Sequence, residues 1–490
     1  MQRKHIAIIG GGIGGLASAI LLARAGYRVS LFEKNPTLGG VCNRSSEDGF
    51  TFDTGPSWYM MPEVYEEFFN SVGENIRDYL KLVRLDPSQK AFFDGRPQPY
   101  EFSSDFEKDK KVFEALAPNS ESALGKYYAR AKRRYKIAMP HIRNERSETI
   151  LAYMKLFFSG KVFGLGRMGT MQREISRLTP SSELRAILSV PSLFLGTMPW
   201  RVPSLFSFLT YADFGKGIWY PMGGMYKIVE ALVAVGKKNA VEYHTSSPVR
   251  RVETEGGRAI GLTLENGERI TADIVLSNAD RSHTEQLLPA SDRDHSDAFW
   301  KKKIPTFGAV LIFLGVSKKL PELAHHNFFF AENWDEHLHD IERGVLSQNP
   351  SFYVNIPSAT DPSCAPSGME NVFVLIPVPA STSLTKEDLD ACADRVIEKI
   401  ATRVPSFKDS IALDRRWYPS DFGEKYNSFK NSALGLALTH FQTAPFRPSH
   451  TSRHIDNLYF VGSTTNPGAG VPACFLSAER VVKQIEKAET

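Results

Sequence analysis

Cysteine is scarce in this chain of 490 residues, which contains four of them. Cys42, Cys364, Cys392 and Cys474 are widely separated, and none belongs to a C-x-x-C pair or to a Cys/His spacing that suits a metal. This scatter excludes a disulfide scaffold and argues against a zinc site. We therefore expect a reduced protein in the cytoplasm, with no bound metal.

Long apolar runs are also missing. No stretch reaches the about 18 consecutive apolar residues that a membrane-spanning helix needs. The apolar stretch 186–212 is interrupted by Pro191, Pro199 and Pro203. The opening MQRKHIAIIGGG has too short an apolar run for a signal peptide, so we expect it to form the first strand of the fold.

Excess charge of one sign is absent too. The net charge is +4, while 42% of the residues are hydrophobic. A polybasic nucleic-acid binder or an acidic tail would shift this balance strongly, so we expect no nucleic-acid partner. The length suits two or three domain-sized units with hydrophobic cores.

Familiar catalytic motifs do not occur. The sequence has no H-E-x-x-H and no G-x-S-x-G, and no carboxylate pair whose spacing requires acid–base chemistry. Such a chain fits an enzyme whose bound cofactor performs the reaction while the protein binds, orients and shields the reactants.

A glycine-rich turn lies near the amino terminus. Gly10, Gly12 and Gly15 form G-x-G-x-x-G between a short apolar strand and an Ala/Leu-rich helix, and a second strand over 28–32 ends at Glu33. Glycines here allow a tight turn, close approach of the backbone to a pyrophosphate and close helix–strand packing. The helix amino terminus favours phosphate, and an acid after the second strand accepts hydrogen bonds from a ribose. The pattern predicts a dinucleotide site that prefers FAD or NAD to NADP; a glycine-rich turn without a ligand is the alternative.

A second glycine-rich loop follows the acid directly. KNPTLGGVCNR places Gly39 and Gly40 just after Glu33, and GFTFDTGPSW adds Gly55 and Pro56. A nicotinamide-binding domain would normally continue with another βα unit there. A loop that turns back over the dinucleotide favours FAD.

Four blocks in order carry a specific resemblance. They are GGGIGG with FEKNPTLGG and GFTFDTGPSWYMMPEVYEEFF, then GIWYPMGGMYKIVEAL, the hairpin-like block 248–280 with its Asn266-Gly267 turn, and NLYFVGSTTNPGAGVPACFLSAERVV near the carboxyl end. Together they resemble the bacterial and fungal phytoene desaturase branch of the flavin amine oxidase superfamily. Residues 105–200 contribute little to this resemblance.

The resemblance implies an α/β fold with three parts. A discontinuous Rossmann-like FAD-binding domain would comprise 1–80, 215–285 and 430–490. A mixed-sheet substrate domain would comprise 81–104 and 286–429, with buried strands in PTFGAVLIFLGV and FVLIPVPA. A helical subdomain would comprise 105–214. Its run 150–166 and the stretch 186–212 are candidates for contact with a membrane surface; buried helices are the alternative.

The resemblance also implies where FAD binds. The carboxyl-terminal strand Leu458 to Val461 would rejoin the nucleotide sheet, and a helix from Ala473 would direct its amino terminus at the flavin. The expected cofactor-binding residues are Gly10, Gly12, Gly15, Glu33, Lys34, Gly39, Gly40, Gly55, Pro56, Val249, Gly462, Ser463, Gly470, Val471 and Pro472. Two positions depart from the family pattern. Val41 stands where many relatives have an arginine, and either Arg44 or backbone N–H groups would replace it. Ser463 stands where many relatives have an aspartate.

The activity implied is FAD-dependent desaturation of phytoene, a long polyisoprenoid, by hydride transfer to flavin. Related carotenoid desaturases, isomerases and ketolases remain alternatives, as does a lipid escort protein that has lost flavin. A peripheral association with membranes would suit such a substrate. Asp213, Asp280 and His440 are candidate proton acceptors, but helix-capping acids and structural histidines are commoner than catalytic bases and give the simpler explanation, so the catalytic residue is left unassigned.

Overall fold

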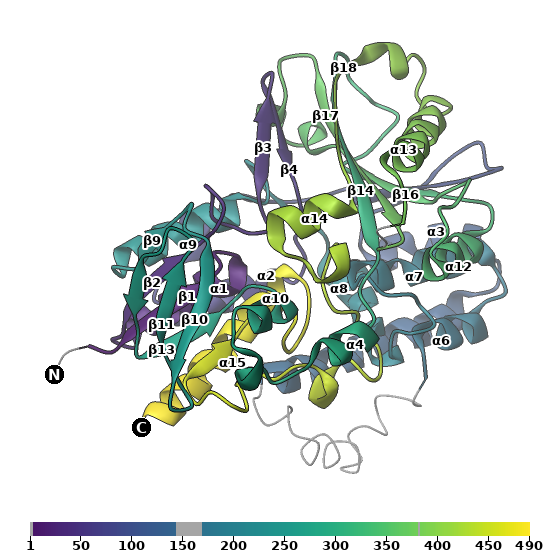
Figure 1. The fold of residues 1–490 in the computed structure, drawn as a ribbon. Helices are drawn as coiled ribbons and strands as arrows, with labels where there is room; N and C mark the ends of the chain where they lie inside the picture. The colour runs from purple at the N-terminus through teal and green to yellow at the C-terminus, as the bar shows by residue number, and fades with distance from the viewer. Residues whose placement is uncertain (1–2, 144–168, 381–382) are drawn as a thin grey trace.

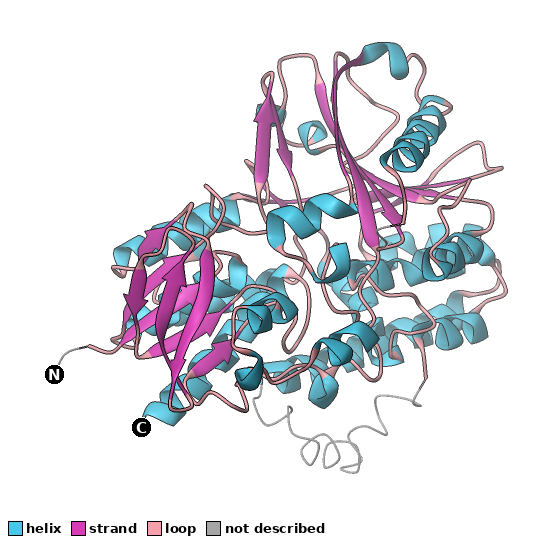
Figure 2. Cartoon of the chain, in the orientation of Figure 1, coloured by secondary structure: helices cyan, strands magenta, loops and turns pink. Residues whose placement is uncertain are grey.

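The computed structural model describes residues 3–143, 169–380 and 383–490. Its two principal sheets lie apart, with helices around and between them (Figures 1 and 2). None of the helices in these ranges combines the length and apolar character needed to cross a bilayer.

One sheet is five-stranded and parallel, and it collects strands from distant parts of the chain. Its order is β19 (Leu458–Phe460), β13 (Ile274–Ser277), β1 (His5–Ile9), β2 (Arg28–Phe32) and β9 (Glu242–His244). The central strands are buried on both faces, which explains why they are apolar throughout.

Different elements cover the two faces of this sheet. Helices α1 (Ile13–Arg24), α9 (Lys227–Lys238) and α15 (Val471–Glu489) share a core with Ile6 and Ile8 of β1. The antiparallel strands β10 (Val249–Glu255), β11 (Arg258–Leu264) and β12 (Arg269–Thr271) pack on the other face, against Ala7 and Ile9. The alternation of apolar and polar residues in block 248–280 therefore follows from a sheet with one buried face.

The second large sheet has seven strands and mixed directions. Its order is β18 (Ile411–Trp417), β14 (Gly308–Val316), β17 (Glu370–Val378), β16 (Phe352–Asn355), β15 (His326–Phe330), β6 (Gln89–Phe93) and β7 (Tyr100–Phe102). All neighbours are antiparallel except β15 and β6. Helix α13 (Lys386–Ala401) covers one face, and the other face turns toward the main core.

Segment 105–214 is helical where it is described. It contains α3 (Phe106–Leu116), α4 (Glu121–Arg143), α6 (Met171–Leu178), α7 (Ser182–Phe194) and α8 (Phe208–Lys216). Residues 186–192 of α7 are buried, so the alternative of a buried helix holds for this part of the predicted membrane contact. The other part, run 150–166, lies outside the described residues.

The shorter elements connect these layers. They are β3 (Arg44–Glu47), β4 (Phe50–Asp53), α2 (Pro62–Ser71), β5 (Leu82–Arg84), β8 (Trp219–Pro221), α10 (Arg281–Gln286), α11 (Asp297–Lys302), α12 (Trp334–Arg343) and α14 (Pro419–Tyr426).

The two ends of the chain lie at the same side of the molecule (Figure 1). Helix α15 packs along α1, and Lys4 forms an ion pair with Glu489. The amino- and carboxyl-terminal glycine-rich turns are therefore neighbours, although they lie at opposite ends of the sequence.

Candidate functional site

A cavity of about 700 Å³ extends from the five-stranded sheet to the seven-stranded sheet. This volume is typical of a site that encloses a large organic ligand. Twelve of the fifteen predicted cofactor residues line it; the other three are Gly15, Gly39 and Gly462.

The amino-terminal turn is built for close approach. Gly10 has a φ of +94°, a conformation that residues with side chains rarely adopt. A Cβ atom on Gly15 would lie 2.2 Å from the carbonyl oxygen of Gly10, so α1 packs directly on the turn. Helix α1 starts at Ile13 with no side-chain cap, which leaves its first N–H groups available to an anion.

Asn278 connects this turn to the carboxyl-terminal one. It follows β13, and its amide Nδ2 donates to the Gly10 carbonyl at 3.4 Å. A Cβ on Gly14 would lie 2.6 Å from its Oδ1, and a Cβ on Gly462 would lie 2.7 Å from the same atom. Both turns thus meet at one amide side chain. We did not predict this role, since the only signal is an asparagine directly after a buried strand.

Glu33 is buried and binds the protein backbone. Its Oε2 accepts the Gly11 N–H at 2.8 Å, and its Oε1 accepts the Asn35 N–H at 2.9 Å. The carboxylate still lines the cavity and retains lone pairs for a ligand hydroxyl. Lys34 also lines the cavity, and its Nζ donates to the carbonyl of Glu424 at 2.6 Å.

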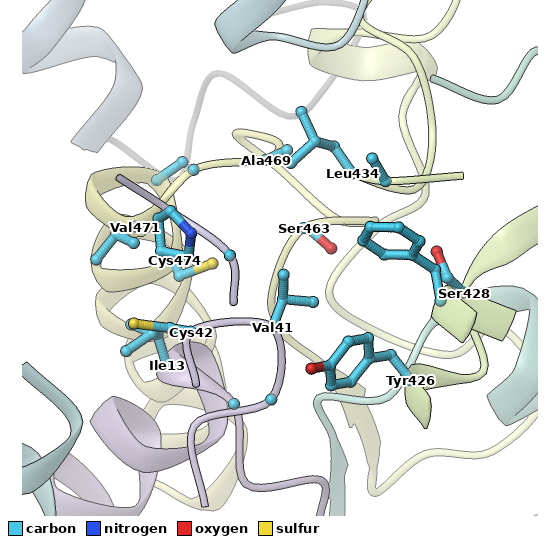
Figure 3. A pocket seen from close by; sticks show the side chains of 18 of the residues that line it. Ile13, Val41, Cys42, Tyr426, Ser428, Leu434, Ser463, Ala469, Val471 and Cys474 are labelled. Carbon is cyan, nitrogen blue, oxygen red and sulfur yellow. The ribbon is translucent and has the colours of Figure 1, made fainter. Parts of the chain in front are cut away.

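The second glycine-rich loop lies against the first. The Gly39 N–H donates to the Gly11 carbonyl at 2.8 Å, and a Cβ on Gly55 would lie 2.0 Å from the Val41 carbonyl oxygen. Val41 itself projects into the cavity (Figure 3). Arg44 does not line it; its guanidinium pairs with Glu230 at 2.8 Å, so the structure does not support Arg44 as a substitute for the missing arginine.

Asp53 joins the first of the four sequence blocks to the second. Its Oδ2 accepts the Met225 N–H at 2.8 Å and its Oδ1 accepts the Tyr226 N–H at 3.1 Å, at the start of α9. Desolvation raises the pKa of this carboxyl to about 6, against the lowering effect of both hydrogen bonds. Gly224 allows this close approach, since a Cβ there would lie 2.9 Å from Oδ2 of Asp53.

A buried arginine holds the carboxyl-terminal loop. The Arg447 guanidinium donates to four carbonyl groups, those of Leu436, Gln442, Ser463 and Thr465, at 2.5–3.0 Å. Burial lowers its pKa to about 9. Ser463 thus contacts Arg447 through its backbone, while its hydroxyl points into the cavity (Figure 3).

Helix α15 begins two positions before the predicted start. Its first residues are Val471 and Pro472, and Gly470 precedes them with a φ of +118°. Proline suits the first turn of a helix because its missing N–H would be unpaired there in any case. The start of α15 lines the cavity beside Cys42 and Cys474 (Figure 3).

Of the three candidate proton acceptors, only Asp280 lines the cavity. Its Oδ1 accepts the Ser282 N–H at 2.9 Å, as the N-cap of α10, which is the simpler explanation given above. Asp213 lies on α8 and accepts hydrogen bonds from Ser104 and Gln89, and burial raises its pKa to about 7. His440 is half-buried and does not line the cavity.

The other end of the cavity is apolar and rich in aromatic side chains. The seven-stranded sheet contributes Ala309, Leu311, Phe328, Phe329, Phe330, Phe352, Tyr353, Leu375 and Pro377. The helical segment contributes Met139, Ile142, Leu193, Phe194, Leu195, Phe206, Phe208 and Leu209. This end suits a hydrocarbon chain rather than a charged or strongly polar ligand.

A sequence model of flavin-containing amine oxidoreductases matches residues 13–486. The chain belongs to this family. Its flavin cofactor is FAD, and the glycine turns, the uncapped start of α1 and the buried acid Glu33 fit a dinucleotide of this kind.

Relatives within the flavin-containing amine oxidoreductase family extend the comparison. The chain is 35% identical to a zeta-carotene-forming phytoene desaturase of Myxococcus xanthus, over 99% of this chain and 94% of the relative. It is 37% identical to a carotenoid 3,4-desaturase of Haloarcula japonica, over 99% and 98%. Among solved structures, an oxidoreductase from Methanosarcina mazei has the same fold, with a TM-score of 0.66 at 18% identity, over 98% of this chain and 100% of that one.

Proposed function

We propose that this protein is an FAD-dependent carotenoid desaturase that introduces conjugated double bonds into phytoene. The observation that carries the proposal is a single cavity with a dinucleotide-binding end and an apolar, aromatic end. The identity to carotenoid desaturases over 99% of the chain supports it.

In this proposal a Rossmann-like domain with the predicted segments 1–80, 215–285 and 430–490 holds FAD across its length. The start of α1 and Gly12 would hold the pyrophosphate, Glu33 would hold the adenosine ribose, and Val249 would contact the adenine. The start of α15 would face the flavin ring, where its helix dipole would stabilise negative charge. When bound, FAD supplies the oxidant that accepts a hydride.

The chain's own residues provide the rest. Removal of a hydride from an allylic carbon of phytoene leaves a cation that conjugation stabilises, and loss of a proton from the adjacent carbon completes the double bond. Apolar side chains such as Phe328, Phe330 and Leu311 keep water away from this cation and align the chain.

We further propose that the protein associates with a membrane surface, because phytoene is insoluble in water. Phe441 and Phe446 support this, since their exposed fractions are 78% and 44% and their rings lie 6.1 Å apart. Sedimentation with liposomes measures the association, and Phe441→Ser is expected to reduce it. Equal binding by the variant would contradict a role for this pair.

The activity test has two arms. The FAD-loaded protein is expected to lose its flavin absorption when phytoene is added without oxygen, and phytoene-producing cells that express it are expected to become coloured. Mass analysis of the pigments separates the alternatives, since desaturation removes two hydrogens per step, ketolation adds oxygen and isomerisation changes no mass. A protein that binds no FAD would favour the lipid escort and reject the desaturase.

A further inference from the structure

Among the described residues that the seven-stranded sheet and segment 105–214 contribute to the apolar end of the cavity, a single one is titratable. This residue is Tyr353 of β16. It pairs directly with Phe328 of β15, so both side chains project from the same face of the sheet into the cavity. The mechanism proposed above requires a proton acceptor at this end and has not used one.

Tyr353 contacts a buried histidine. Its hydroxyl lies 2.6 Å from Nδ1 of His326, which is two residues before Phe328 on β15 and therefore on the same face. His326 is fully buried and does not line the cavity. Its hydrogen bond to the Tyr353 hydroxyl links it to a residue that does. Burial raises the pKa of Tyr353 and lowers that of His326, so both are neutral at rest.

A third residue determines which way the hydrogen bond runs. The amide Nδ2 of Asn355 lies 3.4 Å from the same Nδ1 and also donates to the carbonyl of His325 at 2.9 Å. An amide NH₂ group can only donate, and its bond to the His325 carbonyl orients it, so the contact favours the tautomer in which Nδ1 carries the lone pair and the Tyr353 hydroxyl donates to it. Nε2 then bears the hydrogen. This tautomer is the one that can receive a proton from Tyr353.

An aromatic ring stabilises the positive charge that His326 would carry after it receives a proton. Trp58, which lines the cavity, stacks on His326 with ring centroids 4.0 Å apart and an interplanar angle of 11°. The face of an indole attracts a cation, so this stack stabilises an imidazolium more than a neutral imidazole. His325, the residue before β15, is the other titratable group in ring contact with His326 besides Tyr353, at 4.6 Å, and would oppose the charge only if it were itself protonated.

We propose that Tyr353 and His326 act together as the proton acceptor of the desaturation. This inference rests on the proposed function. Bound FAD would accept the hydride that the substrate loses, and a proton would pass from the adjacent carbon to the Tyr353 oxygen. At the same time the Tyr353 hydroxyl proton passes to Nδ1 of His326. A carbon beside an allylic cation is very acidic, so a neutral phenol–imidazole pair is basic enough to receive its proton.

Anaerobic flavin reduction by phytoene tests the pair. Tyr353→Phe and His326→Gln are each expected to slow the reaction about 10²- to 10⁴-fold, the usual contribution of general base catalysis. The dissociation constants for FAD and phytoene, followed by fluorescence, are expected to change less than about threefold, because neither group is needed for burial of an apolar chain. The double variant is expected to be no slower than the slower single one.

Two matched variants serve as controls. Tyr127→Phe removes a buried hydroxyl outside the cavity, where Tyr127 contacts Thr210 at 3.3 Å, and His325→Gln changes the neighbouring buried histidine, which contacts Thr360 at 2.8 Å. Both are expected to keep the wild-type rate within about threefold. A Tyr353→Phe enzyme with the wild-type rate would overturn the proposal, and so would loss of activity with parallel loss of FAD binding.

A measurement on the apo-protein is independent of activity. Nitrogen-15 spectra of labelled histidine are expected to show His326 with an unprotonated Nδ1 that accepts a hydrogen bond, and Tyr353→Phe is expected to shift that resonance. A protonated Nδ1 in the wild type would refute the pair. If these spectra are as expected but phytoene does not reduce the flavin, the proposed substrate fails and the hydrogen-bond geometry of the pair stands.

Discussion

Gly15→Ala tests whether FAD binding depends on direct contact between α1 and the turn before it. A Cβ at this position would lie 2.2 Å from the Gly10 carbonyl oxygen and 3.2 Å from the Cβ of Asn278. The optimal separation of nonbonded heavy atoms is about 3.5 Å, and here the obstructing atom belongs to the backbone. The helix start or the turn must therefore move.

The size of the effect follows from the cost of overpacking, about 1–3 kcal/mol. The apo-protein can relieve this strain by moving α1 away from the turn, but the cradle must close again when FAD binds. If that cost falls on binding, the dissociation constant for FAD rises about 5- to 160-fold. Titration of the apo-protein with FAD, followed by flavin fluorescence, measures this directly.

Gly125→Ala is the matched control. Gly125 lies inside α4, its φ is not in the left-handed region, and a Cβ there would have no neighbour within 4 Å. The same substitution should leave FAD binding unchanged and raise the free energy of unfolding by about 0.4–1 kcal/mol. If Gly15→Ala binds FAD as tightly as the wild type and melts at the same temperature, the packing argument is wrong.

Four further substitutions probe three separate features. Glu33→Ala should weaken FAD binding by about 1–3 kcal/mol through lost ribose hydrogen bonds. An unchanged FAD dissociation constant would show that the adenosine binds away from Glu33. Ser463→Ala keeps the hydrogen bond from Arg447 to the Ser463 carbonyl, so FAD affinity should fall less than about fivefold. Arg447→Met removes that bond and should lower the melting temperature markedly. Equal melting temperatures and FAD affinities for the two variants would contradict these separate roles. Asp213 has a folded pKa of about 7, above its usual 3.8, so its contribution to stability is complete below about pH 4 and is lost as pH rises through 7. Asp213→Asn should therefore lose less stability than the wild type between pH 5.5 and 8.5 in thermal melts, and parallel curves would refute the assignment.

The glycine turns and their flanking elements could be read from the sequence, because local backbone constraints dictate them. A strand, a tight turn and a helix are specified by neighbours within about twenty residues, and β1, α1 and β2 lie where the pattern predicts. The buried strands β14 and β17 were equally visible, since both are almost continuous apolar runs. The predicted start of α15, Ala473, was two residues too late, because Pro472 suits the first turn of a helix as well as a loop.

The candidate acids show the limit of such reasoning. Asp213, Asp280 and His440 are near recognisable motifs in the sequence, yet only Asp280 lines the cavity, where it caps a helix. Proximity to a motif along the chain does not decide which way a side chain points or which elements surround it.

By itself, the sequence predicted a dinucleotide site, since glycine spacing and an acid after a strand are local features, and its four ordered blocks indicated the flavin enzymes by resemblance. The tertiary structure alone decided that the turns at both ends meet at Asn278, and that Tyr353, His326, Asn355 and Trp58 form one cluster beside the cavity. The physical reason is that strand pairing and packing set these contacts between residues far apart in the chain, and no local pattern records them.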